Sequence, residues 1–160
     1  MTKFKFPMLL AAAITGSVVV PAFAAKQPTW TEYVHGGDVM MQHKQTANAQ
    51  RYYAAALSML ARTPRPDPRV GTEMWRAPLN SLLYGYLGTC PMPVVADGQK
   101  AQLSEKDLFS LKQRIAVNRQ IATTYSAMFG STARPSVAAA TQLAKAQKLY
   151  EEATSPKQPG

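Results

Sequence analysis

The side chains of this chain that could hold a metal ion are two histidines with two methionines between them. His35 and His43 are eight residues apart, about two turns of an α-helix, so they cannot share one ion directly. Met40 and Met41 offer the soft ligands that copper prefers, but they also continue an apolar stripe, which favours packing in a core. With a single cysteine and no close pair of histidines, the sequence predicts no zinc site, no other metal and no cofactor.

The nine acidic residues offer little for acid–base catalysis. Glu73 is the one acid beside aromatic surface, at Trp75, where a general acid could act on a glycan. It has no partner carboxylate and no flanking motif, and the chain lacks a serine nucleophile elbow, a P-loop and a glycine-rich dinucleotide turn. We therefore expect that the chain is not an enzyme. A glycan-cleaving activity based on Glu73 ranks third, after the two non-catalytic functions given at the end of this subsection.

Four arginines form the sharpest charge cluster in the sequence: Arg62, Arg65, Arg69 and Arg76. Three prolines between the first and last of them favour an extended, exposed linker. The cluster predicts an anion-binding edge; the plainer alternative is a solvated linker whose charge is diluted by Asp67 and Glu73.

Residues 1–24 have the features of a secretory signal peptide. Two lysines precede an apolar run from Met8 to Val20, and Ala22-Phe23-Ala24 is a small-x-small cleavage site. The run is shorter than the roughly 20 residues that span a bilayer. We expect cleavage after Ala24, export to the periplasm or medium and no membrane span afterwards. The rest predicts one helical domain, residues 25–153, with a disordered tail at 154–160.

The charge balance of the exported part bears on its partners. Loss of the two lysines leaves 16 basic and 9 acidic residues, a net charge of +7. This favours an anionic envelope surface or an acidic protein face, although a merely solubilising surface would look the same. Nucleic acid is not an expected partner of an exported protein. Cys90 is the only cysteine, so it is either a packed thiol or the site of a bridge between two chains.

These side chains must be positioned by helices, and the stretch from Trp30 to Leu60 has the clearest pattern. Two stripes recur at helical spacing: Trp30, Tyr33, Val34, Gly37, Met40 and Met41, then Ala49, Tyr53, Ala56, Leu57 and Leu60. Small residues on both stripes let two antiparallel helices approach closely. The pattern therefore predicts that the Tyr53 ring lies over Gly37.

The order Gly37, Ala49, Tyr53, Ala56 resembles the tetratricopeptide repeat, a helix–turn–helix unit of about 34 residues. Gly36 stands where that pattern has a leucine-like residue, and a generic helical hairpin would give the same spacing. The run Leu79 to Tyr86 resembles the first helix of a second unit, although Leu83 is large where a small residue is preferred. The resemblance implies a groove lined by Thr31, Val34, Asp38, Met41, Gln42, Asn80, Tyr84 and Leu87.

About five helices are expected in all, in an all-α fold of stacked antiparallel hairpins. The first two run from an N-cap at Thr29 to about Gln45, and from a cap at Thr46 to about Arg62. The third starts at Asp67-Pro68, is kinked or split at Pro78 and ends at Gly88. After a long loop, Thr89 to Leu103, a fourth begins at Ser104 and stops at Gly130. The last runs from Pro135 to about Ala153.

Two functions remain open at this point. The first is a non-catalytic exported adaptor or assembly factor that binds a protein or peptide of the cell envelope in the groove. The second is a small helical inhibitor or immunity-type protein, in which the loop Thr89 to Leu103 blocks an envelope enzyme.

Overall fold

The computed structural model describes residues 28–65, 73–95 and 103–155, and all regular structure within these ranges is helical. Five α-helices follow one another: α1 (Trp30–Gln42), α2 (Thr46–Leu60), α3 (Arg76–Gly88), α4 (Glu105–Phe129) and α5 (Arg134–Thr154), with a short 3-10 turn, η1 (Glu73–Trp75), before α3. The all-α fold class is confirmed. The expected signal peptide, the start of the third helix at Asp67-Pro68 and residues 156–160 of the tail lie outside the described residues.

The α1–α2 hairpin begins and turns as local chemistry dictates. Thr29 is the N-cap of α1 and forms a capping box with Glu32. At the other end, Lys44 takes a positive φ of 58°, and the amide of Gln45 donates to the Met40 carbonyl over 2.8 Å. This closes the helix in the manner of a Schellman motif. The prediction that Thr46 caps α2 is wrong, because Thr46 is its first residue and the preceding Gln45 is the N-cap.

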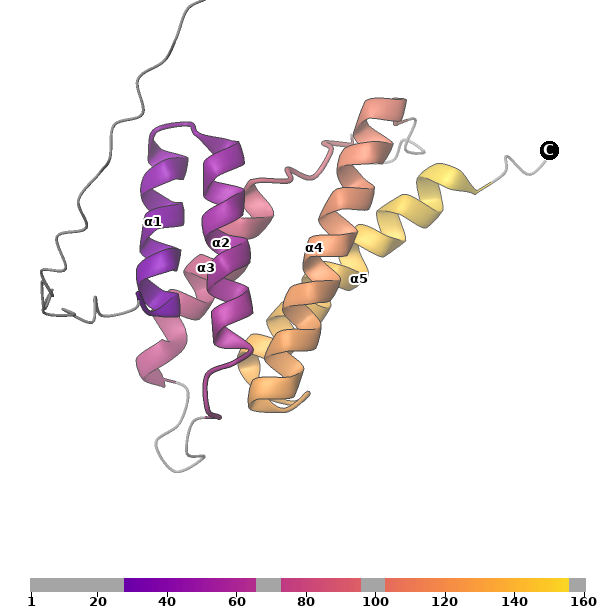
Figure 1. The fold of residues 1–160 in the computed structure, drawn as a ribbon. Coiled ribbons are helices and arrows are strands. Elements are labelled where there is room, and N and C mark those ends of the chain that lie inside the picture. Colours follow the sequence, from indigo (N-terminus) through magenta and orange to yellow (C-terminus); the bar gives the residue numbers. More distant parts are fainter. Residues whose placement is uncertain (1–27, 66–72, 96–102, 156–160) are drawn as a thin grey trace, which may run out of the picture.

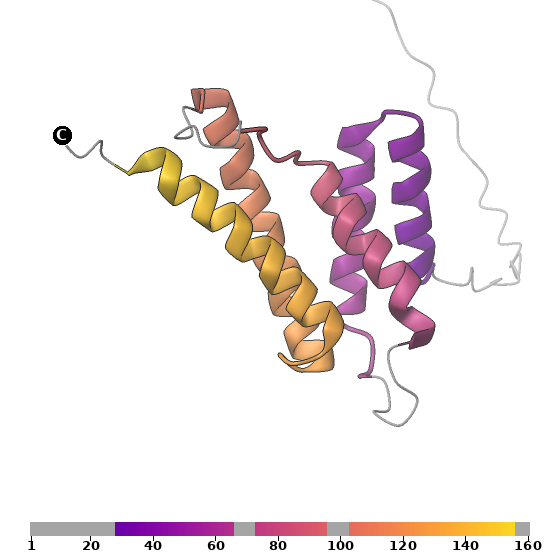
Figure 2. The same cartoon turned by 180° about the vertical axis from the view of Figure 1, so that it is seen from behind.

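Helix α3 lies across the α1–α2 hairpin and packs against both of its helices, as Figure 2 shows from behind. Pro78 falls in the first turn of α3, where the missing amide would have no partner in any case. The three residues directly before α3 form the 3-10 turn η1 and not α-helix. Helix α3 is continuous through Pro78, and the expected start of this helix lies outside the described residues, so a longer helix split at Pro78 stays a prediction.

Helices α4 and α5 form the second hairpin, which stands beside the first three helices (Figure 1). Ser104 caps α4, its hydroxyl accepting from the Asp107 amide over 3.2 Å, and Gly130 ends the helix with a φ of 87°. Pro135 lies in the first turn of α5. Both helices therefore begin and end within a residue or two of the expected positions.

Aromatic side chains join the two parts of the fold. Trp75 makes edge contacts with Trp30 on one side and Phe129 on the other, and Phe129 contacts Tyr125. The Tyr125 hydroxyl donates to the Leu79 carbonyl of α3 over 2.7 Å. A continuous core results, which includes Tyr53, Leu57, Leu60, Leu79, Leu82, Leu83, Ile121 and Tyr125. None of the described helices has both the length and the apolarity needed to cross a membrane.

Candidate partner-binding face

Helix α3 presents an uncovered polar and aromatic stripe. Tyr84 is 54 % exposed and Asn80 is exposed one turn before it, so the two share one side of the helix. Leu79, Leu83 and Tyr86 point into the core instead. Among the described residues the Tyr84 side chain makes no hydrogen bond or ring contact, which leaves its ring and hydroxyl to solvent.

Helix α1 runs beside α3 and adds side chains at the seam between them. The Asp38 carboxylate accepts a 2.6 Å hydrogen bond from the Ser81 hydroxyl of α3. Met41 is partly buried and lies over Gly88, where a Cβ would be 3.4 Å from its Cε. Gln42 is exposed beyond it. We call Asp38, Met41, Gln42, Asn80 and Tyr84 the α1–α3 face.

Two predicted groove residues lie in the core, and a third lies at the start of α1. Val34 and Leu87 are each only 2 % exposed and belong to the core, so the prediction that they contact a partner is wrong. Both also continue apolar stripes, and burial of such side chains outweighs any position they hold in a repeat pattern. Thr31 is half-buried near the start of α1, where its hydroxyl is 2.9 Å from that of Thr29. It lies about two turns before Asp38 on the same side of the helix, and its contact with a partner stays a prediction.

Beneath this face, Tyr53 of α2 links three helices. Its hydroxyl donates to one oxygen of Asp38 over 2.7 Å, while the other oxygen accepts from Ser81. The ring lies between Gly37 and Gly85, as predicted for Gly37, and stacks on Tyr86 at a centroid distance of 6.1 Å. Asp38 is thus held in place by two hydrogen bonds and is oriented before any partner arrives.

The stability of the fold should fall at alkaline pH. Burial, with the hydrogen bond and charge of Asp38, raises the pKa of Tyr53, and burial alone raises the pKa of Tyr125. The folded state therefore favours the neutral phenols, so their contribution is complete below the ordinary pKa of about 10 and is lost as pH rises above it. In urea titrations from pH 8 to pH 11.5, each phenol should add a slope of up to about 1.4 kcal/mol per pH unit.

Tyr53→Phe and Tyr125→Phe serve as the matched variants for this measurement. Each loses a hydrogen bond and is less stable at pH 8, but its unfolding free energy should fall less steeply above pH 10. Equal slopes in wild type and both variants would contradict the burial of these two hydroxyls.

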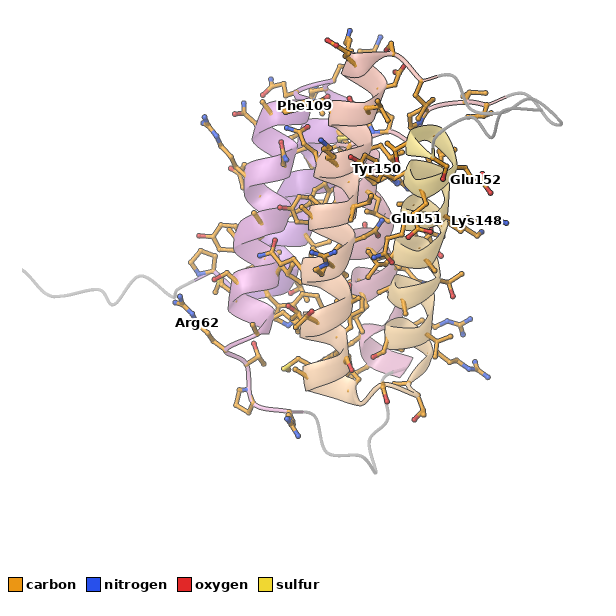
Figure 3. The ribbon with its side chains drawn as sticks, turned by 90° about the vertical axis from the view of Figure 1, so that its right-hand side faces the viewer. Arg62, Phe109, Lys148, Tyr150, Glu151 and Glu152 are labelled. Atoms are coloured by element: carbon orange, nitrogen blue, oxygen red, sulfur yellow. The ribbon has the colours of Figure 1, made fainter. Side chains whose placement is uncertain are left out.

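The predicted anion-binding edge is described in part. Arg62 and Arg65 follow α2 and are exposed, and Arg76 is exposed at the start of α3. Figure 3 labels Arg62 toward the end of the bundle where α4 turns into α5. Arg69 lies outside the described residues. The binding of one anion by all four arginines stays a prediction.

The residues considered for metal binding are separated. His35 and His43 are exposed, whereas Met40 and Met41 pack against the core, as the apolar stripe predicts. Within residues 28–65, 73–95 and 103–155, no group of three or more histidine, cysteine or carboxylate side chains could hold a metal ion. Cys90 is 3 % exposed, which favours the packed thiol over a bridge between chains.

Arg114 of α4 is a structural residue that the sequence interpretation missed. Its guanidinium donates to the carbonyls of Leu87 and Cys90, over 2.9 and 2.7 Å, at the end of α3. Burial lowers the pKa of this arginine. A detectable signal existed: Leu111, Arg114, Asn118 and Tyr125 recur at helical spacing, and a cation within an apolar stripe indicates a buried partner.

The geometry of the α1–α3 face is the basis for any assignment of function. Comparison of the chain with protein-family models, with curated proteins and with solved structures finds no match.

Proposed function

We propose that this chain is a non-catalytic, exported adaptor or assembly factor that binds a protein or peptide segment of the cell envelope on its α1–α3 face. The features of a signal peptide in residues 1–24 support export. The exposed stripe of α3 supports binding of a partner. The net positive charge supports an anionic envelope surface as a second contact.

The observation that carries this proposal is the exposure of Tyr84. A tyrosine combines a large apolar ring with a polar tip, and such residues are enriched among the side chains that dominate interface energy. Tyr84 is 54 % exposed, and Asn80 adds an amide that can donate and accept one turn away. Asp38, fixed by Tyr53 and Ser81, brings a carboxylate to the seam beside them.

The proposal includes a tetratricopeptide-like style of binding. Helices α1 and α3 run in the same direction, and α2 returns antiparallel between them in sequence (Figure 1). In a repeat of this kind the first helix of each unit lines the binding surface. By this proposal α1 and α3 are those first helices, and the α4–α5 hairpin covers the end of the stack.

Tyr84→Ala should weaken the partner by more than about 1 kcal/mol while leaving the melting temperature nearly unchanged, because the ring touches little of the fold. The measurement is quantitative capture from envelope extract by immobilised wild-type and variant protein, followed by titration of the captured species. Phe109→Ala is the matched control, since Phe109 is 62 % exposed on α4, away from the α1–α3 face (Figure 3).

Equal losses for the two variants would mean non-specific capture by exposed aromatics. Unfolding of Tyr84→Ala would mean that the residue belongs to the core. Glu73→Gln should change neither binding nor stability, and loss of a glycan-cleaving activity in that variant would replace the adaptor with an enzyme.

A second function, inhibition of an envelope enzyme by the loop after α3, is favoured by one observation. Val94 in that loop is 98 % exposed, and an apolar side chain so placed can insert into a pocket of another protein. Val94→Asp tests this alternative. If capture depends on Val94 and not on Tyr84, and a single hydrolase is captured, the inhibitor hypothesis replaces the adaptor.

A further inference from the structure

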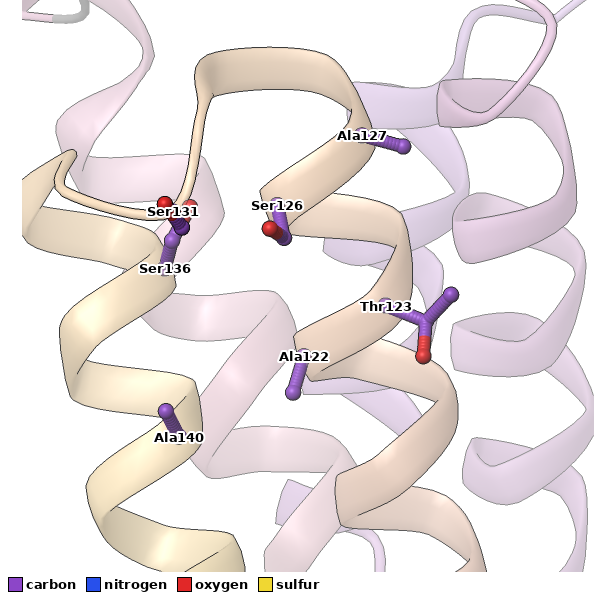
Figure 4. Close-up of a pocket in the computed structure, with 7 residues that line it drawn as sticks. All are labelled: Ala122, Thr123, Ser126, Ala127, Ser131, Ser136 and Ala140. Carbon is purple, nitrogen blue, oxygen red and sulfur yellow. The ribbon is translucent and has the colours of Figure 1, made fainter.

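A depression opens where α4 turns into α5. It has a volume of about 560 Å³ and lies between the last turns of α4 and the first turns of α5 (Figure 4). Its lining consists of small side chains alone: Ala122, Thr123, Ser126, Ala127, Ser131, Ser136 and Ala140. Four of these seven residues carry hydroxyl groups, so the depression offers hydrogen-bond donors without any charged acceptor.

Ser136 is the unusual member of this lining. It is only 3 % exposed, and its Oγ has no hydrogen-bond partner within the described part of the chain. Buried hydroxyls are almost always paired, because an unpaired one loses its bonds to water without replacement. Figure 4 shows the Ser136 side chain directed toward the turn that carries Ser131. An acceptor brought into the depression would satisfy this hydroxyl.

The start of α5 lacks the cap that the other long helix has. Ser104 supplies a side-chain oxygen to the first turn of α4, but the N-cap of α5 is Ala133, which has none. The first-turn amides of a helix have no partner within the helix, and the helix dipole makes that end positive. Pro135 carries no N–H and the Val137 amide already donates to the Ala133 carbonyl, so Arg134 and Ser136 supply the remaining first-turn amides of α5, next to the lining residue Ser136.

The charges of the chain segment that lines the depression also favour an anion. No acidic residue occurs between Asp107 and Glu151 in the sequence, whereas six basic residues do. Glu151 and Glu152 lie at the opposite end of α5 from the turn (Figure 3). Arg134 is exposed in the first turn of α5. A cation at the N-terminus of a helix is repelled by the positive end of the helix dipole, and a bound anion would remove this repulsion.

We propose that this depression binds the phosphate group of a small anion or of a lipid headgroup. The hydroxyls of Ser126, Ser131 and Ser136 and the amides of Arg134 and Ser136 donate to its oxygens, and the Arg134 side chain balances its charge. The depression is wider than a bare phosphate, which leaves room for the group to which the phosphate is esterified. This site is separate from the α1–α3 face and does not depend on the adaptor function.

The test is a titration of the ¹⁵N-labelled protein with inorganic phosphate, at ionic strength held constant with sodium chloride. We expect saturable shifts of the Ser131 and Ser136 amides in the millimolar range. Ser136→Ala and Ser131→Ala should each weaken binding about fivefold or more, through the loss of a charge-assisted hydrogen bond. Ser155→Ala removes a hydroxyl from the other end of α5 and should leave binding unchanged.

A second arm uses phosphatidylcholine vesicles with and without phosphatidic acid. Binding that requires phosphatidic acid and Ser136 assigns the site to a lipid headgroup, whereas binding of inorganic phosphate alone assigns it to a soluble phosphate. Circular dichroism of each variant checks folding, and Ser131, which is exposed, can be changed without loss of core packing.

Two results would overturn the proposal. One is the absence of localised shifts with either probe up to about 50 mM phosphate. The other is binding that Ser155→Ala weakens as much as Ser136→Ala does, since it would then follow the net charge of the protein. The Tyr84→Ala variant should bind phosphate normally, because Tyr84 is not part of the depression. Failure of the phosphate proposal therefore leaves the adaptor proposal intact, and failure of the adaptor proposal leaves the phosphate proposal intact.

Discussion

Tyr53→Ala is expected to lower the free energy of unfolding by about 3–5 kcal/mol, measured by urea titration at neutral pH. The side chain is 1 % exposed, and its ring fills the space between Gly37 of α1 and Gly85 of α3. Truncation leaves a cavity that three helices would have to close. It also removes the 2.7 Å hydrogen bond to Asp38, which then remains at the seam with Ser81 alone.

Gly37→Leu should destabilise the same place from the other side. A Cβ on Gly37 would lie 2.5 Å from Cε1 of Tyr53, so ring or helix must move, at about 1–3 kcal/mol or more. Gly88→Ala is the matched control, because a Cβ there meets only Met41 at an ordinary 3.4 Å. It should be neutral or slightly stabilising, as alanine favours a helix.

The double variant Gly37→Leu/Tyr53→Ala should lose less stability than the sum of the two single variants, because the leucine can enter the cavity left by the ring. A strictly additive result with small single losses would mean that α1 and α2 do not meet at these residues. The close approach of the two helices would then be wrong, and the resemblance to a tetratricopeptide repeat would lose its main support.

The contact between Gly37 and Tyr53 could be predicted because it depends on one local hairpin. Two stripes at helical spacing, joined by a short turn, allow one register, and a glycine opposite a large ring indicates where the backbones are closest. The second glycine on this ring, Gly85, could not be found in the same way. It comes from α3, whose position over the hairpin depends on packing between elements far apart in sequence.

The candidate site was harder to predict for a related reason. A repeat pattern assigns residues to a face by position, but exposure depends on the neighbours that each helix meets. Val34 and Leu87 fit the groove positions and are nevertheless buried, because α1 and α3 pack against each other as well as against α2. Tyr84 stays exposed because it is off the apolar stripe of α3, which is visible in the sequence alone.

The second hairpin illustrates what periodicity leaves out. Its helix boundaries follow from Ser104, Gly130 and Pro135, each a local signal. The burial of polar residues in its interior does not follow from such signals. Asn118 is completely buried and donates to the Gln142 carbonyl over 3.4 Å, and the Ser136 hydroxyl is buried with no hydrogen-bond partner among the described residues. Whether a polar residue at such a position is buried depends on how α4 and α5 pack against each other, which the periodicity of either helix alone does not give.

Arg114→Met should lower the free energy of unfolding by about 2–3 kcal/mol. The guanidinium donates to the Leu87 and Cys90 carbonyls at the end of α3, where the helix dipole also favours a cation. Methionine keeps most of the apolar stem, so the loss reports on the two hydrogen bonds rather than on packing. Arg119→Met is the matched control, since Arg119 is exposed on the same helix and should change stability by less than about 0.5 kcal/mol.

Arg114→Lys separates charge from geometry. It keeps the cation near the dipole but cannot reach two carbonyls with one planar group, so its stability should fall between wild type and Arg114→Met. Amide hydrogen exchange adds a local measurement: protection should be lost first at the end of α3, around Leu87 to Cys90, because the guanidinium links that end to α4. If Arg114→Met, Arg114→Lys and Arg119→Met were all as stable as wild type, the two hydrogen bonds of Arg114 would contribute nothing to stability. The second hairpin would then be held against the first three helices by the packing around Tyr125.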